Sequence, residues 1–158
     1  MEVIGYKCFN NGLVTNYGDR LEVGKTYSAD GDISYGKNGY HFCLNMEDTF
    51  RYFDTFNNEV EVAKVLGSGK IDSSFDDYNE YYDLYCAEHI QVLEVLSRAQ
   101  IIEYGLKLHG PRAWRFVSTF CLSKEEIELF KDKFSKEYTT LLRIKYYQEI
   151  PKAKTRKL

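Results

Sequence analysis

The sequence predicts an α+β fold, with an antiparallel or mixed sheet from the N-terminal two-thirds and helices mainly in the C-terminal part. Short runs rich in β-branched and aromatic residues, separated by Gly and Asn turn signals, fill residues 1–97. Two capping-box spacings, Ser97 with Gln100 and Ser123 with Glu126, precede apolar stretches of helical period. At 158 residues the chain is predicted to form a single domain over residues 1–150, followed by a basic tail at 151–158.

Three strands are expected before residue 46. Glu2 to Phe9 is β-branched and aromatic and ends at the turn signal NNG, and residues 21–29 form a second extended piece that bends at Gly24. The third strand, NGYHFCLN, covers residues 38–45. Its alternation divides the side chains between two faces: Tyr40, Phe42 and Leu44 on one, His41 and Cys43 on the other.

A short amphipathic helix is predicted over residues 45–54, with Asn45 as its N-cap. Residues 57–69 alternate as a strand that is buried more on one face. The GSGK stretch at 67–70 lacks the spacing of a phosphate-binding loop, and Ile71 stands where such a loop needs Ser or Thr, so a turn is expected there. Residues 89–97 form a further strand.

Helices follow in the C-terminal part. Residues 99–110 are predicted to form a helix that Gly110-Pro111 stops, with His109 near its end interacting with the helix dipole. Residues 112–122 fit a strand or a helix. The second capping box precedes a helix over 125–138 with one apolar stripe, and residues 139–150 continue it or return as a strand, which their β-branching slightly favours.

The apolar runs are far shorter than the ~20 residues of a membrane-spanning helix, and the N-terminus lacks the pattern of a signal peptide. We therefore expect a cytoplasmic location in a host cell and no membrane contact. In that compartment cysteines are expected as reduced core thiols. The chain has four: Cys8, Cys43, Cys86 and Cys121.

A tetrahedral zinc site is conceivable, because His41 and Cys43 share a strand face while Cys86 and His89 stand three residues apart. Spacing does not show whether these four side chains converge, and His-x-Cys is an unusual half-site. Buried thiols and a core histidine are the preferred interpretation. We accordingly predict no metal, no cofactor and no catalytic residue, and the enzyme question stays open, leaning towards a protein that is not an enzyme.

The net charge of −3 is unevenly distributed. Residues 71–97 hold seven acids and no Lys or Arg, so the rest of the chain sums to +4. Within this stretch, carboxylates alternate with aromatic rings, which suits a basic partner groove; in a helix the tyrosines would share one face. A solvated loop is the plainer alternative. The candidate partner-binding residues are Asp76, Asp77, Tyr78, Glu80, Tyr81, Tyr82, Asp83 and Tyr85.

A second candidate surface is RAWRF, where Arg112 and Arg115 flank Trp114. Trp with Arg is typical of interface hot spots and of base-stacking platforms. The plainer interpretation places Trp114 in the core with both arginines solvated. The four bases of the tail make a weak electrostatic footprint, so direct binding of nucleic acid is not expected.

The stretches GYKCF, LEVGKTY, DISYGKNGYHFCLNMEDTFRYF, VEVAKVLGSGKI and CAEHIQVLEVLSRAQII resemble an uncharacterised domain family of phage and prophage proteins, often placed ahead of pentapeptide-type repeats. The likeness covers residues 4–104, and VGKTY and GYHFC are its most specific pieces. It implies origin in a phage or mobile element but no activity. The repeats are absent, and residues 105–150 have no recognised counterpart, so they are expected to form a helical extension.

A weaker likeness is to ADP-ribosyltransferases. It implies candidate positions at Lys7, Tyr40 to Phe42 and Glu94. Lys7 replaces the His or Arg expected on the first strand, and no Ser-Thr-Ser strand is present.

These features lead to one function hypothesis and two alternatives. The first is a phage-encoded accessory protein with an acidic, Tyr-rich surface resembling nucleic acid, which binds a basic groove on a host nucleic-acid-handling or defence complex, such as a CRISPR effector, and in its stronger form inhibits it. The alternatives are an ADP-ribosyltransferase-like enzyme and a structural, self-assembling virion protein. The oligomeric state cannot be predicted.

Overall fold

The computed structural model describes residues 1–74 and 84–143. The predicted α+β class is confirmed, with strands in the N-terminal two-thirds and helices mainly in the C-terminal part. The chain clusters into two compact units, and the single domain over residues 1–150 stays a prediction. The first comprises Met1–Thr49 and Val60–Leu96, and the second comprises Phe50–Glu59 and the chain from Ser97 onward. Each unit is described by itself.

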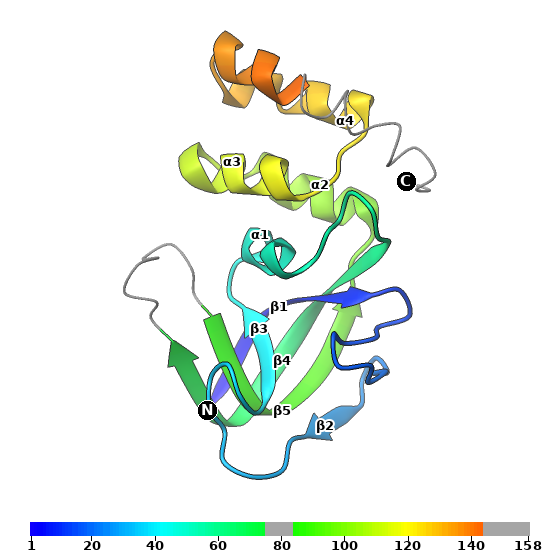
Figure 1. Cartoon of the computed structure of the whole chain (residues 1–158), viewed down its shortest axis with the longest axis vertical. Helices are drawn as coiled ribbons and strands as arrows, with labels where there is room; N and C mark the ends of the chain where they lie inside the picture. Colours follow the sequence, from blue (N-terminus) through cyan, green and yellow to red (C-terminus); the bar gives the residue numbers. More distant parts are fainter. Residues whose placement is uncertain (75–83, 144–158) are drawn as a thin grey trace. The chain divides into compact units, whose positions relative to one another are not determined.

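The first unit is built on an antiparallel sheet whose strand pairings close into a ring, so that it forms a small barrel (Figure 1). Around the ring, β1 pairs with β4, β4 with β5, β5 with β3, and β3 with β1. The short strand β2 pairs with β5 outside the ring. The strands are β1 (Glu2–Asn10), β2 (Thr26–Ser28), β3 (Tyr40–Cys43), β4 (Val60–Ser74) and β5 (Leu84–Val95).

The barrel interior is filled by apolar side chains from the strands and from the segment between β1 and β2. Phe42 is 3% exposed, and a Cβ added at Gly67 would lie 2.6 Å from its ring. Glycine at this position therefore lets a large aromatic ring fit inside a small barrel. The buried residues of the cluster are Phe9, Leu13, Leu21, Phe42, Ala63, Val65, Ala87, Ile90 and Val92.

The expected turn at GSGK is wrong, because β4 runs through residues 67–70 without a break. Its pairing with β5 is irregular between Ser68 and Ile71, and Gly69 has a φ of +77°. The Gly-Ser-Gly run thus forms a bulge inside a long strand. The β5 strand likewise begins at Leu84, five residues before the predicted start at 89.

The predicted helix over 45–54 is shorter and tighter than expected. It consists of the α-helix α1 (Met46–Thr49) and the 3₁₀ turn η1 (Phe50–Tyr52). The boundary between the two units falls between Thr49 and Phe50. A regular ten-residue helix is therefore replaced by two single turns.

The second unit is helical. Both predicted capping boxes are confirmed: Ser97 with Gln100 begins α2, and Ser123 with Glu126 begins α4. Residues 112–122, ambiguous in sequence, lie largely in α3. The elements are α2 (Arg98–Leu106), α3 (Gly110–Thr119), α4 (Lys124–Leu129), the 3₁₀ turn η2 (Lys131–Lys133) and a helix that begins at residue 136 and is described to 143.

Three details of the helical prediction are wrong. Gly110-Pro111 does not stop a helix but begins α3, where Pro needs no N–H partner, so His109 is an N-cap rather than a C-terminal residue. The predicted helix over 125–138 breaks after Leu129. The described part of 139–150 is helical, against the slight preference for a strand.

Tight packing joins α2 to α3. A Cβ added at Gly105 would overlap the ring of Phe116, so the α2 backbone lies directly against that ring. Phe116 also contacts Phe50, Phe120 and Phe130, with ring centroids 5.6 to 5.9 Å apart. These four rings form much of the core of the second unit.

The packing predicts the effect of Gly105→Ala. At an open helix position this change gains about 1 kcal/mol of helix propensity. Here the added methyl group collides with Phe116, so overpacking should cost about 1–3 kcal/mol and leave a net loss of stability in urea unfolding. A Phe116→Leu background should reduce the loss. A melting temperature raised by Gly105→Ala would contradict this packing.

Candidate functional site

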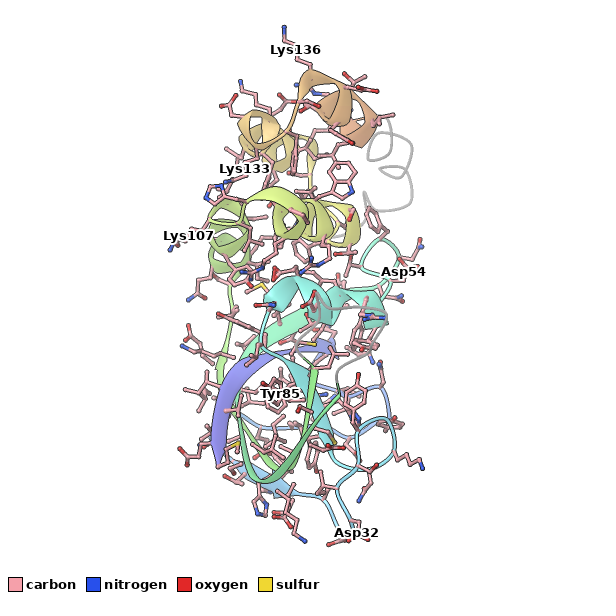
Figure 2. All side chains as sticks on the ribbon, turned by 90° about the vertical axis from the view of Figure 1, so that its left-hand side faces the viewer. Asp32, Asp54, Tyr85, Lys107, Lys133 and Lys136 are labelled. Atoms are coloured by element: carbon pink, nitrogen blue, oxygen red, sulfur yellow. The ribbon has the colours of Figure 1, made fainter. Side chains whose placement is uncertain are left out.

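The predicted acidic surface lies on the connection between β4 and β5. The two strands stay paired up to Ser74 and Leu84, which bracket residues 75–83. The structure places Tyr85 inside β5, where its ring stacks on Phe42 at 5.8 Å and packs against the barrel core (Figure 2). A helix carrying all four tyrosines is therefore wrong at its C-terminal end. Asp76, Asp77, Tyr78, Glu80, Tyr81, Tyr82 and Asp83 lie outside the described residues.

The second predicted surface, around Trp114, belongs to α3. The half-buried indole meets Phe134 and Tyr138 edge to face, at 5.4 and 5.5 Å between ring centroids. Arg112 is exposed and donates a hydrogen bond to the Tyr104 hydroxyl at 3.1 Å, while Arg115 is half-buried. The contacts give Trp114 a packing role within the second unit, and partner binding by these three residues stays a prediction.

The structure brings together a row of three polar side chains on neighbouring strands. His41 of β3 and Asp72 of β4 are the partners of Cys86 of β5 on its two sides. The loop from Ser34 to Asn38 binds to all three. Tyr35 N–H donates to Asp72 at 2.8 Å, Gly36 N–H donates to His41 Nε2 at 2.8 Å, and the Cys86 thiol donates to Asn38 O at 3.0 Å.

The electrostatics of this row do not suit a thiol nucleophile. Burial raises the pKa of Cys86 to about 11, and the Asp72 charge adds to the effect. Burial, assisted by the Lys7 charge, lowers the pKa of His41. A protonated thiol beside a neutral imidazole is a poor nucleophile, so the row anchors the loop instead. Gly39, with a φ of +120°, allows this anchoring of the loop, because a Cβ there would overlap the Cys86 sulfur.

Lys7 is a charged residue on the inward-facing side of β1. Its Nζ donates to the His41 carbonyl at 2.6 Å, and burial lowers its pKa to about 8. This contact joins GYKCF to GYHFC, two of the stretches that carry the family resemblance, and Tyr6 and Cys43 pair beside it. An amine of this kind is partly neutral near pH 8 and is a better nucleophile than an ordinary lysine.

The ADP-ribosyltransferase likeness places a second polar residue at Glu94. That residue is exposed on β5 opposite Lys64, whereas the Lys7 ammonium lies at the His41 carbonyl. The enzyme alternative stays a prediction.

The four candidate zinc ligands do not converge. His41 and Cys86 are neighbours, but His41 Nε2 already accepts a hydrogen bond from the loop, and His89 lies opposite Ser28 and Ser68. Within residues 1–74 and 84–143, no group of three or more His, Cys, Asp or Glu side chains could hold a metal ion. All four cysteines are buried and free, as predicted.

Sequence reasoning missed Asp72 and the loop at residues 34–39. The spacing gave no signal, since Asp72, Cys86 and His41 become neighbours only through the register of β3, β4 and β5.

Among the described residues, no helix is both long and apolar enough to cross a membrane.

The geometry of His41 predicts a pH-dependent stability. The pKa of His41 in the folded protein is below the ordinary value of about 6.5, so the stabilising contribution of its neutral imidazole is fully present above that pH. This contribution is lost as the pH falls towards the folded-state pKa. Urea unfolding at pH 7.5 and 5.5 should therefore show a larger loss in the natural protein than in His41→Gln. His109→Gln changes an exposed histidine and serves as the control. Equal losses in all three proteins would contradict this role.

The burial of Lys7 predicts that stability also depends on pH in the alkaline range. Since its folded pKa is lowered to about 8, stability should rise as the pH increases from about 8 towards the ordinary value of 10.5. Lys7→Met should lack this rise. At pH 7 it should be more stable than the natural protein by roughly 1–2 kcal/mol, which is the removed cost of burying the charge less the value of the lost hydrogen bond. Differential scanning fluorimetry across this range tests it, with the exposed Lys70→Met as control. A Lys7→Met protein that keeps the rise would contradict the burial of the charge.

Comparison with known protein families matches residues 3–104 to the family described as Domain of unknown function (DUF7666). The match spans the whole strand-rich part of the first unit and ends in α2. No curated protein matches the chain. No solved structure matches it either. The predicted resemblance to an uncharacterised family is confirmed in its extent, and the chain belongs to this family of unknown function.

Proposed function

We propose that this protein is a phage-encoded accessory protein that binds a basic groove on a host nucleic-acid-handling or defence complex, such as a CRISPR effector, and inhibits it by occupying that groove. The acidic, tyrosine-rich connection between β4 and β5 is the binding element. Phage origin rests on the family resemblance, and the nature of the partner rests on charge.

The observation that supports this proposal is the pairing of Ser74 with Leu84, the two residues that bracket the acidic connection in the sequence. Residues 75–83 contain four acids and three tyrosines and no Lys or Arg. The chain enters and leaves this stretch at adjacent positions of a paired hairpin that is part of a closed barrel. Anchored ends lower the entropy cost of ordering a binding segment, which favours affinity.

Charge makes a basic partner the preferred one. The two described acids nearest the connection accept hydrogen bonds from the barrel: Asp72 from Tyr35 N–H, and Glu88 from Lys70 N–H. The connection holds four acids and no Lys or Arg within residues 75–83, so it is where the negative charge of the hairpin is concentrated. A concentrated negative patch steers a positively charged groove towards it and raises the association rate.

An ADP-ribosyltransferase-like enzyme is the alternative from another class. It requires a pocket for a nicotinamide dinucleotide, so that ligand should raise the melting temperature of the enzyme and leave that of the binding protein unchanged.

Removing the charge from the connection tests the proposal. The variant Asp76→Asn, Asp77→Asn, Glu80→Gln and Asp83→Asn should lose most of its partner recovery in pull-downs from host lysate at low salt, and about 0.5 M salt should reduce recovery by the natural protein, because salt screens charge attraction. The control removes four exposed acids of equal total charge elsewhere: Glu22→Gln, Asp30→Asn, Asp32→Asn and Glu59→Gln.

Mass spectrometry of the bound proteins should identify a basic, nucleic-acid-handling partner. Full recovery by the folded connection variant at low salt would contradict the proposal. So would an equal loss in the control variant, which would show that only the total charge matters.

A further inference from the structure

A second group of polar residues lies on the outer face of the barrel, apart from the acidic connection and from the row at Cys86. Ser28 Oγ of β2 lies 2.7 Å from His89 Nδ1 of β5. His89 Nε2 lies 3.3 Å from Glu88 Oε1. Hydroxyl, imidazole and carboxylate are thus linked in series, which is the arrangement of an activated serine nucleophile.

Glu88 and His89 are neighbours on β5, yet both reach solvent, beside an irregularity of the sheet. Adjacent strand positions normally point to opposite sides, yet Ala87 and Ile90 are both fully buried in the barrel core. Glu88 and His89, between them, are both partly exposed. Opposite them, β4 has the bulge between Ser68 and Ile71. Bulges are over-represented beside active sites.

Gly69 makes room for the group. With a φ of +77°, it lies in the left-handed region, and a Cβ there would come within 2.5 Å of Glu88 Oε1 and 2.7 Å of His89 Cδ2. The next residue helps to fix the carboxylate, since Lys70 N–H donates to Glu88 Oε1 at 3.3 Å. Gly69 and the Lys70 N–H therefore shape this site, within a stretch where a turn was expected.

The contacts of the two ring nitrogens, a hydrogen bond at Nδ1 and an ion-pair contact at Nε2, favour one tautomer of the imidazole. A carboxylate at Nε2 favours a proton on that nitrogen, which leaves the Nδ1 lone pair to accept from the Ser28 hydroxyl. In the best-known serine hydrolases, the two ring nitrogens have the opposite partners, but the roles of nucleophile, base and orienting acid are the same.

We propose that Ser28 is a nucleophile for acyl esters, with His89 as its general base and Glu88 as the residue that orients His89. As the Ser28 oxygen forms a bond to the ester carbonyl carbon, its proton passes to His89 Nδ1. The C–O bond to the alcohol then breaks, and the leaving oxygen takes that proton. A water oxygen then bonds to the carbonyl carbon of the acyl-serine while its proton passes to His89 Nδ1. The C–O bond to Ser28 breaks, the Ser28 oxygen takes that proton, and the free acid leaves. No other reactant is required.

Exposure indicates the kind of substrate. Ser28 is exposed, and the His89 and Glu88 side chains are 36% and 29% exposed. The site is thus open to solvent on the outer face of the barrel, which suits a small acyl group presented at a surface. This activity is independent of partner binding by the acidic connection.

A fluorophosphonate probe tests the site directly, because it reacts with activated serines with loss of fluoride. Intact mass and peptide mapping should show one phosphonyl group per chain, located on Ser28. Ser28→Ala should abolish labelling, and His89→Gln should slow it about 100-fold, since general-base catalysis is worth 10²–10⁴-fold. Ser68→Ala is the matched control, because Ser68 faces His89 from β4, and its labelling rate should be unchanged.

Absence of label on Ser28 in the natural protein would overturn the proposal, and so would an unchanged labelling rate in folded His89→Gln. Circular dichroism establishes that each variant is folded. Glu88→Gln gives a second test that keeps the side-chain size: slower labelling supports an orienting role for the carboxylate, and an unchanged rate removes Glu88 from the site.

Discussion

The pairing of β5 on both of its edges is the constraint on which the first unit depends. One edge pairs with β4 from Val95 to Leu84, and the other pairs first with β3 and then with β2. Three features of this unit are placed by that strand. Cys86 receives its two polar neighbours, His89 meets Ser28, and Leu84 holds one end of the acidic connection. A change in the β5 register would separate all three arrangements at once.

Polar residues in and around the small barrel are retained at some cost in stability. Burial opposes the charged forms of Lys7 and His41, and both side chains make hydrogen bonds: Lys7 joins β1 to β3, and the His41 ring holds the loop that precedes β3. Buried polar groups of this kind need all their partners. The family boundary at residues 3–104 fits this picture, because it encloses these interactions and leaves α3 and α4 outside.

The sequence predicted local features well and long-range ones poorly. Both capping boxes and the strand at Glu2 were predictable, because each depends on residues within a few positions of one another. Two glycines within residues 67–70 are compatible with a turn and with a bulge. The sequence favours the turn, but the pairing with β5 shows that the structure is a bulge. His41 was recognised as a candidate ligand, but its neighbours Cys86 and Asp72 follow from a register that composition does not encode. The same holds for Ser28 and His89.

Residue-resolved amide hydrogen exchange would test the closed ring most directly. The account predicts slow exchange along β1, β4 and β5, and also in the short strand β3, because its pairs with β1 and β5 close the ring. Exchange in Tyr40–Cys43 as fast as in the exposed loops, with β4 and β5 still protected, would contradict it. The barrel would then be an open sheet, and His41 would have no fixed place beside Cys86.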